Sequence, residues 1–173
     1  MPSESKTQRV LNTMLVVSWI AFIGLMIEAG AILFSYGVSI VNSDAPRVLY
    51  PGLGIFESNQ FGFGHYTTAV IVLTLISAFQ AFVCYLVIQI LSKVSLSNPF
   101  VLETAIRLKR ISYVLMGIWI LSVIQYVHLA ILSSQTLSLK GDVIPGEYLF
   151  VAGLVYIIAK LFKRGIELQA KND

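Results

Sequence analysis

The sequence predicts an all-α, polytopic membrane protein: a four-transmembrane-helix bundle with both termini in the cytoplasm. Of its 173 residues, 57% are hydrophobic and only 12% are charged, and the mean hydropathy is +0.81. This composition is too apolar for an ordinary soluble domain. Three segments without Asp, Glu, Lys or Arg are long enough to cross about 30 Å of hydrocarbon. They are Val10–Ile27, Ser58–Ser92 and Ile111–Leu139.

The distribution of basic residues predicts the orientation. Ten of the 12 Lys and Arg residues fall on one side of the predicted membrane, namely Lys6, Arg9, Lys93, Arg107, Lys109, Arg110, Lys160, Lys163, Arg164 and Lys171. Only Arg47 and Lys140 fall on the other side. The positive-inside rule places the richer side in the cytoplasm. The net charge of +3 does not indicate nucleic-acid binding, because the cations lie at the ends of spans and not along one face.

The first predicted span covers residues 10–41 and contains Glu28, the only carboxylate within a predicted span. Ala29-Gly30-Ala31 also matches a small-x-small cleavage site, so a signal peptide is the alternative. The apolar segment before Glu28 is longer than the hydrophobic core of a typical signal peptide, which favours an uncleaved span.

The second predicted span covers residues 65–91 and follows a turn-rich outer loop over residues 42–64. Ser77 and Ala81 form a small-xxx-small pair that favours close helix packing. Gln80 and Gln89 lie at membrane depth, where an amide without a partner is costly. We therefore expect both glutamines to find partners on neighbouring helices.

A cytoplasmic connector helix is predicted over residues 99–110, starting at Asn98-Pro99. Glu103, Arg107 and Arg110 recur at i, i+4 and i+7 and so share one polar face. This helix leads without a break into the third span, residues 111–133. A second outer loop follows over residues 137–147. The whole chain, residues 1–173, is predicted to form a single membrane domain.

The fourth predicted span covers residues 148–164. Its uncharged segment, Tyr148–Ala159, is short, and it reaches a full span only if Lys160 extends its ammonium toward the headgroups. The helix is expected to continue to about Ala170.

Two cytoplasmic stretches are similar to a bacterial membrane-protein family catalogued as domain of unknown function 2975. The first is Ser97-Asn98-Pro99-Phe100 followed by Arg107-Leu108-Lys109-Arg110-Ile111. The second is Ala152-Gly153-Leu154, then Phe162-Lys163-Arg164-Gly165-Ile166-Glu167-Leu168-Gln169 and Asn172-Asp173. The sequence departs from the family at Lys171, where an acidic residue is usual. The resemblance implies four helices in the bacterial cytoplasmic membrane and no assigned enzymatic activity. It also implies a partner, because relatives are often encoded beside a small helix-turn-helix regulator.

No enzymatic activity is expected, because the sequence contains no nucleophile elbow, phosphate loop, paired carboxylates or HExxH motif. Cys84 is the only cysteine, which excludes disulfides and thiolate metal sites within one chain. His65 and His128 raise the question of haem ligation, but the sequence has no attachment motif. We therefore predict no cofactor and no metal.

An intramembrane polar cluster is one candidate site, formed by Glu28, Gln80, Gln125 and His128. Counted from Val10 and from Ile111, Glu28 and His128 lie at similar heights, about 27 Å and 25 Å. They would pair if the first and third spans touch. The functional alternative that follows is a small-molecule or ion-binding or transport component with an outward-facing pocket. The structural alternative is an interhelical hydrogen bond, or a Glu28 in contact with outer water.

A cytoplasmic docking face is the other candidate, formed by Arg107, Lys109, Arg110, Lys163, Arg164 and Glu167. It predicts a non-catalytic, regulatory or partner-binding membrane protein that acts on a cytoplasmic protein. The alternative is that these cations only set the topology and contact anionic lipid. The expected partners are the lipid bilayer, a cytoplasmic protein and, in an oligomer, further copies of the chain, with no direct nucleic-acid contact.

Overall fold

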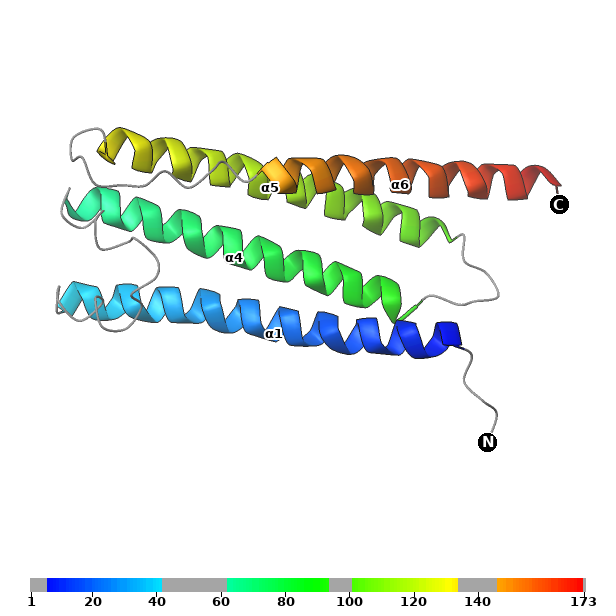
Figure 1. The fold of residues 1–173 in the computed structure, drawn as a ribbon, viewed down its shortest axis with the longest axis horizontal. Helices are drawn as coiled ribbons and strands as arrows, with labels where there is room; N and C mark the ends of the chain where they lie inside the picture. The colour runs from blue at the N-terminus through cyan, green and yellow to red at the C-terminus, as the bar shows by residue number, and fades with distance from the viewer. Residues whose placement is uncertain (1–5, 42–61, 94–100, 134–145, 173) are drawn as a thin grey trace.

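Within the residues that it describes, the computed structural model contains four long helices, which confirms the all-α prediction (Figure 1). It describes residues 6–41, 62–93, 101–133 and 146–172. The helices are α1 (Lys6–Val41), α4 (Phe63–Leu91), α5 (Leu102–Ser133) and α6 (Gly146–Asn172). Asn98-Pro99, most of the predicted outer loop 42–64 and most of loop 137–147 lie outside the described residues.

Each helix runs antiparallel to the next, and α4 lies between α1 and α5 (Figure 1). The start of α1 therefore lies at the same end of the bundle as the end of α4, the start of α5 and the last turns of α6. We call this the basic end, and the opposite end the far end.

Three helices, α1, α4 and α5, are long and apolar enough to cross a membrane. Many of their large apolar side chains are exposed, among them Ile20 and Ile27 of α1 and Ile124 of α5. Such side chains would be costly in water but are suited to lipid tails. The length and composition of these three helices therefore favour a membrane bundle whose outer surface faces hydrocarbon.

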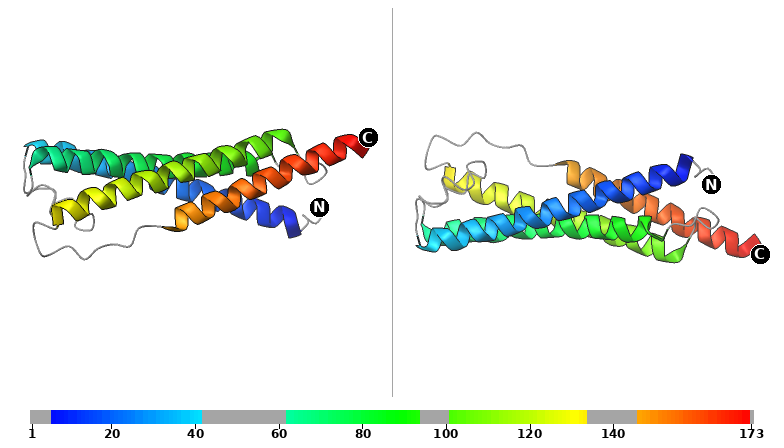
Figure 2. Two further views of the ribbon diagram at one scale, coloured as in Figure 1. Left: turned by 90° about the horizontal axis from the view of Figure 1, so that it is seen from above. Right: turned by 90° about the horizontal axis from the view of Figure 1, so that it is seen from below.

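The buried core has two parts, and α4 contributes to both. Ile32 of α1 packs with Tyr66 and Val70 of α4. A larger cluster joins α4, α5 and α6 through Leu86, Ile111, Leu115, Ile118 and Ala152. The buried residues of α1 all belong to its second half, and Figure 2 shows the first half diverging from α4 toward the basic end.

Helix α6 is displaced along α5 toward the basic end. The Ser112 hydroxyl donates a hydrogen bond of 2.8 Å to the carbonyl oxygen of Ala152, which fixes the register. From this contact α5 continues 21 residues to Ser133, whereas α6 reaches back only 6 residues to Gly146. The difference of 15 residues corresponds to about 22 Å of helix. Accordingly, α6 begins near the middle of α5 and extends past the basic end (Figure 1).

The displaced helix α6 also has a short uncharged segment. The uncharged segment Tyr148–Ala159 has 12 residues, about 18 Å of helix, which is shorter than the hydrocarbon thickness of about 30 Å. Small buried residues spaced seven apart, Ala152 and Ala159, allow α6 to approach α5 closely at this register. A fourth crossing is thus a prediction from the sequence, while three helices satisfy the requirement for a span.

Candidate functional site

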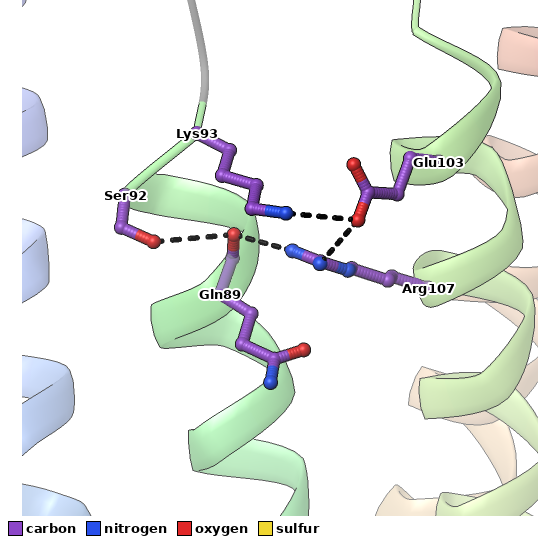
Figure 3. Close-up of polar contacts among 5 residues, drawn as sticks. All are labelled: Gln89, Ser92, Lys93, Glu103 and Arg107. Carbon is purple, nitrogen blue, oxygen red and sulfur yellow. Dashed lines mark hydrogen bonds and ion pairs between the residues drawn. The ribbon is translucent and has the colours of Figure 1, made fainter.

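The basic end begins with a polar junction between the end of α4 and the start of α5 (Figure 3). The Lys93 ammonium donates to the Glu103 carboxylate at 3.1 Å, and Arg107 donates to the same carboxylate oxygen. Arg107 also donates from Nη1 to the carbonyl oxygen of Gln89, at 2.6 Å. One guanidinium therefore ties the first turns of α5 to the last turn of α4.

This contact satisfies a backbone group that the helix itself cannot satisfy. The last carbonyls of an α-helix have no intrahelical partner, and they carry the negative end of the helix dipole. The Gln89 carbonyl accepts hydrogen bonds from Arg107 and from the Ser92 hydroxyl. The Arg107 side chain is only 14% exposed, so it is an interhelical clamp and not a free surface charge.

The electrostatics of the junction centre on Glu103, which lies before the apolar segment that begins at Ile111. The hydrogen bond from Lys93 holds the pKa of the Glu103 carboxyl below its ordinary value. The positive charges of Arg107 and Lys93 act in the same direction. Both Glu103 and Lys93 are more than half exposed, so water screens this pair and its contribution to stability is small.

Beside the junction, a groove of about 230 Å³ runs between α5 and α6. Residues of α5 and of α6 contribute equally to its walls, namely Leu102, Ala105, Ile106, Lys109, Tyr156, Ala159, Lys160 and Lys163. Ala105 and Ala159 are buried, and their small side chains leave the space that the groove occupies. We call this the α5–α6 groove.

Three ammonium groups border the α5–α6 groove, and none of its lining residues is acidic. Two of them lie over aromatic rings, Lys109 over Tyr113 at 5.5 Å and Lys160 over Tyr156 at 5.6 Å from nitrogen to ring centroid. Cation–π contacts of this kind restrain the lysines without neutralising them. The groove therefore presents an apolar floor and a positively charged rim, which suits an anionic, amphipathic ligand.

The structure divides the docking face predicted from the sequence. Lys109 and Lys163 line the α5–α6 groove, whereas Arg107 points to α4. Glu167 lies 3.9 Å from Lys163, at the limit of an ion pair. Arg110 and Arg164 are exposed and make no ion pair with the described part of the chain.

The predicted intramembrane cluster is also divided. Gln80 donates to the hydroxyl of Tyr148 at 2.6 Å, linking α4 to the first turn of α6. Gln125 is buried in α5. The ring of His128 lies 5.3 Å from that of His65, between centroids. Glu28 has neither a hydrogen bond nor an ion pair within the described ranges.

The register explains why the structure does not bring Glu28 to His128. Tyr36 of α1 packs on Tyr66 of α4 at 5.8 Å, and the adjacent His65 packs on His128. Tyr36 and His128 are therefore at similar heights on opposite sides of α4. Glu28 lies eight residues before Tyr36, about 12 Å closer to the basic end. The predicted equal height of Glu28 and His128 requires Val10 and Ile111 to lie at the same height along the bundle axis. In the structure they do not.

Sequence reasoning missed two features. Lys160 is absent from the predicted docking face, although its position three residues before Lys163 places both on one face of α6. His65 is absent from the predicted intramembrane cluster, because no local pattern links it to His128, 63 positions away. The fold brings them together because α4 and α5 are antiparallel neighbours.

Comparisons with known proteins agree with the resemblance in the connector and the C-terminal helix. A family model described as "Protein of unknown function (DUF2975)" matches residues 41–173, which include all of α4, α5 and α6. Comparison with curated proteins yields no match, and comparison with solved structures yields none either. Because the family model matches most of the chain, the expectation from the sequence is confirmed, and the protein belongs to the DUF2975 family.

Proposed function

We propose that this protein is a non-catalytic membrane protein that binds a cytoplasmic protein at its basic end. In this proposal the bundle lies in the bacterial cytoplasmic membrane, α6 completes a fourth crossing, and the basic end with both termini faces the cytoplasm. The distribution of the 12 basic residues supports this orientation. The partner is a small helix-turn-helix regulator, as the resemblance implies, and binding holds it at the membrane.

The α5–α6 groove is the observation that carries the proposal. Its volume of about 230 Å³ is below the roughly 300–1,000 Å³ of sites for drug-sized molecules. It is better suited to one or two apolar anchor side chains of a protein partner. Lys109, Lys160 and Lys163 then pair with acidic residues that flank those anchors.

The residues of the groove favour binding over chemistry. Its polar lining residues are Tyr156 and three lysines, and it contains no carboxylate or histidine as a base and no serine or cysteine as a nucleophile. An acidic amphipathic segment from the regulator fits this lining. The three lysines would also steer the encounter through their summed positive field.

Co-purification with a small helix-turn-helix regulator, the partner that the resemblance implies, tests the proposal. In the test variant, Lys109→Glu, Lys160→Glu and Lys163→Glu are combined. In the matched control, Arg110→Glu, Arg164→Glu and Lys171→Glu are combined, which changes the net charge equally outside the groove. We expect the test variant to reduce recovery of the regulator at least about tenfold and the control to leave it nearly unchanged.

The same assay in nanodiscs of neutral lipid separates protein docking from lipid binding. If the groove holds a protein segment, the regulator binds in neutral lipid as well. The proposal is wrong if both triple variants retain the regulator equally, or if recovery requires anionic lipid regardless of the groove lysines.

A further inference from the structure

The two histidines of the chain meet at the far end of the bundle. His65 lies in the first turn of α4 and His128 near the end of α5. Their rings are 5.3 Å apart between centroids, with an angle of 40° between the ring planes. His65 is exposed, whereas His128 is partly buried. The pair therefore has one member that is accessible from outside the bundle and one that is held within it.

Two buried polar atoms of α5, one of them in His128 itself, lack hydrogen-bond partners. Within the described ranges, Nε2 of His128 and Oε1 of Gln125 are the fully buried side-chain atoms without one. Gln125 precedes His128 by three residues, so both side chains lie on the same face of α5. Gln125 is only 8% exposed. A buried polar atom without a partner is destabilising, which makes two on one helix face a feature to be explained.

The spacing of the two rings fits coordination of one ion. Metal–nitrogen bonds of about 2.0–2.1 Å at a tetrahedral centre hold the centroids of two imidazole ligands about 5 Å apart. The observed distance of 5.3 Å between the ring centroids matches this spacing. The exposed ring of His65 provides a path of entry.

We propose that His65 and His128 bind one divalent transition-metal ion, with the Gln125 amide oxygen as a third, weaker ligand. Imidazole donors favour Zn²⁺, Cu²⁺ and Ni²⁺ over Mg²⁺ and Ca²⁺, which prefer carboxylates and water. Water completes the coordination. The ion bridges α4 and α5 at the far end, distant from the α5–α6 groove, so this site and partner docking fail or succeed independently.

Zn²⁺ binding by the full chain in neutral detergent tests the site. The protein is purified through a tag without histidine, so that His65 and His128 are the only imidazoles present. Calorimetric titration is expected to show saturable binding of one Zn²⁺ per chain. His65→Ala abolishes it, and Gln125→Leu weakens it about tenfold. Cys84→Ser is the matched control and leaves the affinity unchanged, because Cys84 lies elsewhere on α4.

Cu²⁺ provides a second readout that does not depend on a variant at the buried position. Its electron paramagnetic resonance spectrum is expected to show coupling to two imidazole nitrogens in the wild type and to one in His65→Ala. The proposal is overturned if Zn²⁺ does not saturate a single site, if binding survives His65→Ala, or if the wild-type spectrum shows a single nitrogen.

Discussion

The guanidinium of Arg107 donates a hydrogen bond to the backbone carbonyl oxygen of Gln89, 2.6 Å away on the neighbouring helix. An arginine from the start of α5 thus satisfies the end of α4 while it also holds Glu103 of its own helix. Lysine would not reproduce this arrangement, because a single ammonium lacks the planar set of donors that serves two acceptors at once.

Arg107→Ala is expected to lower the free energy of unfolding by about 1–3 kcal/mol, since it leaves a helix-terminal carbonyl without its charged donor. Titration of a denaturing detergent into mixed micelles measures this. Arg110→Ala is the matched control, because Arg110 is an exposed neighbour on the same helix. Equal effects of the two substitutions would show that Arg107 is not a clamp.

The lowered pKa of Glu103 predicts a pH-dependent contribution to stability. Because folding lowers this pKa from its ordinary value of about 4.5, the contribution is complete above that pH. It is lost as the pH falls through the lower pKa of the folded state. The stability difference between the wild type and Glu103→Gln is therefore constant from pH 7 to about 5 and shrinks below about 4.5.

Unfolding of both proteins across this pH range measures that difference. Lys93→Met serves as the control background, because it removes the hydrogen bond that contributes most to the lowered pKa. A difference that stays constant down to pH 3 would contradict the assignment. So would one that is the same with and without Lys93.

The hydrogen bond between Gln80 and Tyr148 joins α4 to the beginning of α6. Interhelical bonds of this kind in membrane proteins contribute about 0.6 kcal/mol on average and up to about 1.7. A double-mutant cycle with Gln80→Leu and Tyr148→Phe is expected to give a coupling energy in that range. Tyr113→Phe, at an exposed ring, is the control for loss of a hydroxyl. A coupling of zero would exclude the bond.

Because α6 packs closely on α5 along one face only, larger side chains at two adjacent positions of α6 are expected to have opposite effects on stability. Ala152 is fully buried, so Ala152→Leu is expected to destabilise the fold by about 1–3 kcal/mol through overpacking. At Gly153 an added Cβ has no atom within 4 Å, so Gly153→Ala is neutral or slightly stabilising. Thermal unfolding of both variants measures this. If Gly153→Ala destabilised the protein and Ala152→Leu did not, α6 would pack on α5 through a different face.

Features encoded locally could be predicted from the sequence. The apolar runs identify α1, α4 and the later part of α5, and the spacing of Glu103 and Arg107 predicts their ion pair on one helix face. Relations between helices could not be predicted, because they depend on register. The number of residues between two positions does not indicate the displacement of α6 along α5, which the contact between Ser112 and Ala152 fixes. Nor does it indicate the height of Glu28 relative to His128.

In the candidate site, too, the locally encoded features could be predicted and the contacts between helices could not. Charge alone predicts Lys109 and Lys163, but the groove between them depends on two small buried residues, Ala105 and Ala159, that face each other only in the folded protein. The same criterion places Arg107 on this surface, because it is basic and lies near Lys109 in the sequence. The Arg107 side chain points toward α4 because the Gln89 carbonyl lies there, and no sequence pattern indicates the position of that carbonyl.

The most direct test of the account is the side of the membrane on which the basic end lies. In a Cys84→Ser background, single cysteines at Lys93 and Lys163 mark the basic end, and one at Phe63 marks the far end. A maleimide that cannot cross membranes, added outside intact cells, is expected to label the cysteine at position 63 only. Labelling at position 163 but not at 93 would separate α6 from the basic end, and labelling at both would reverse the orientation; either result would contradict the account.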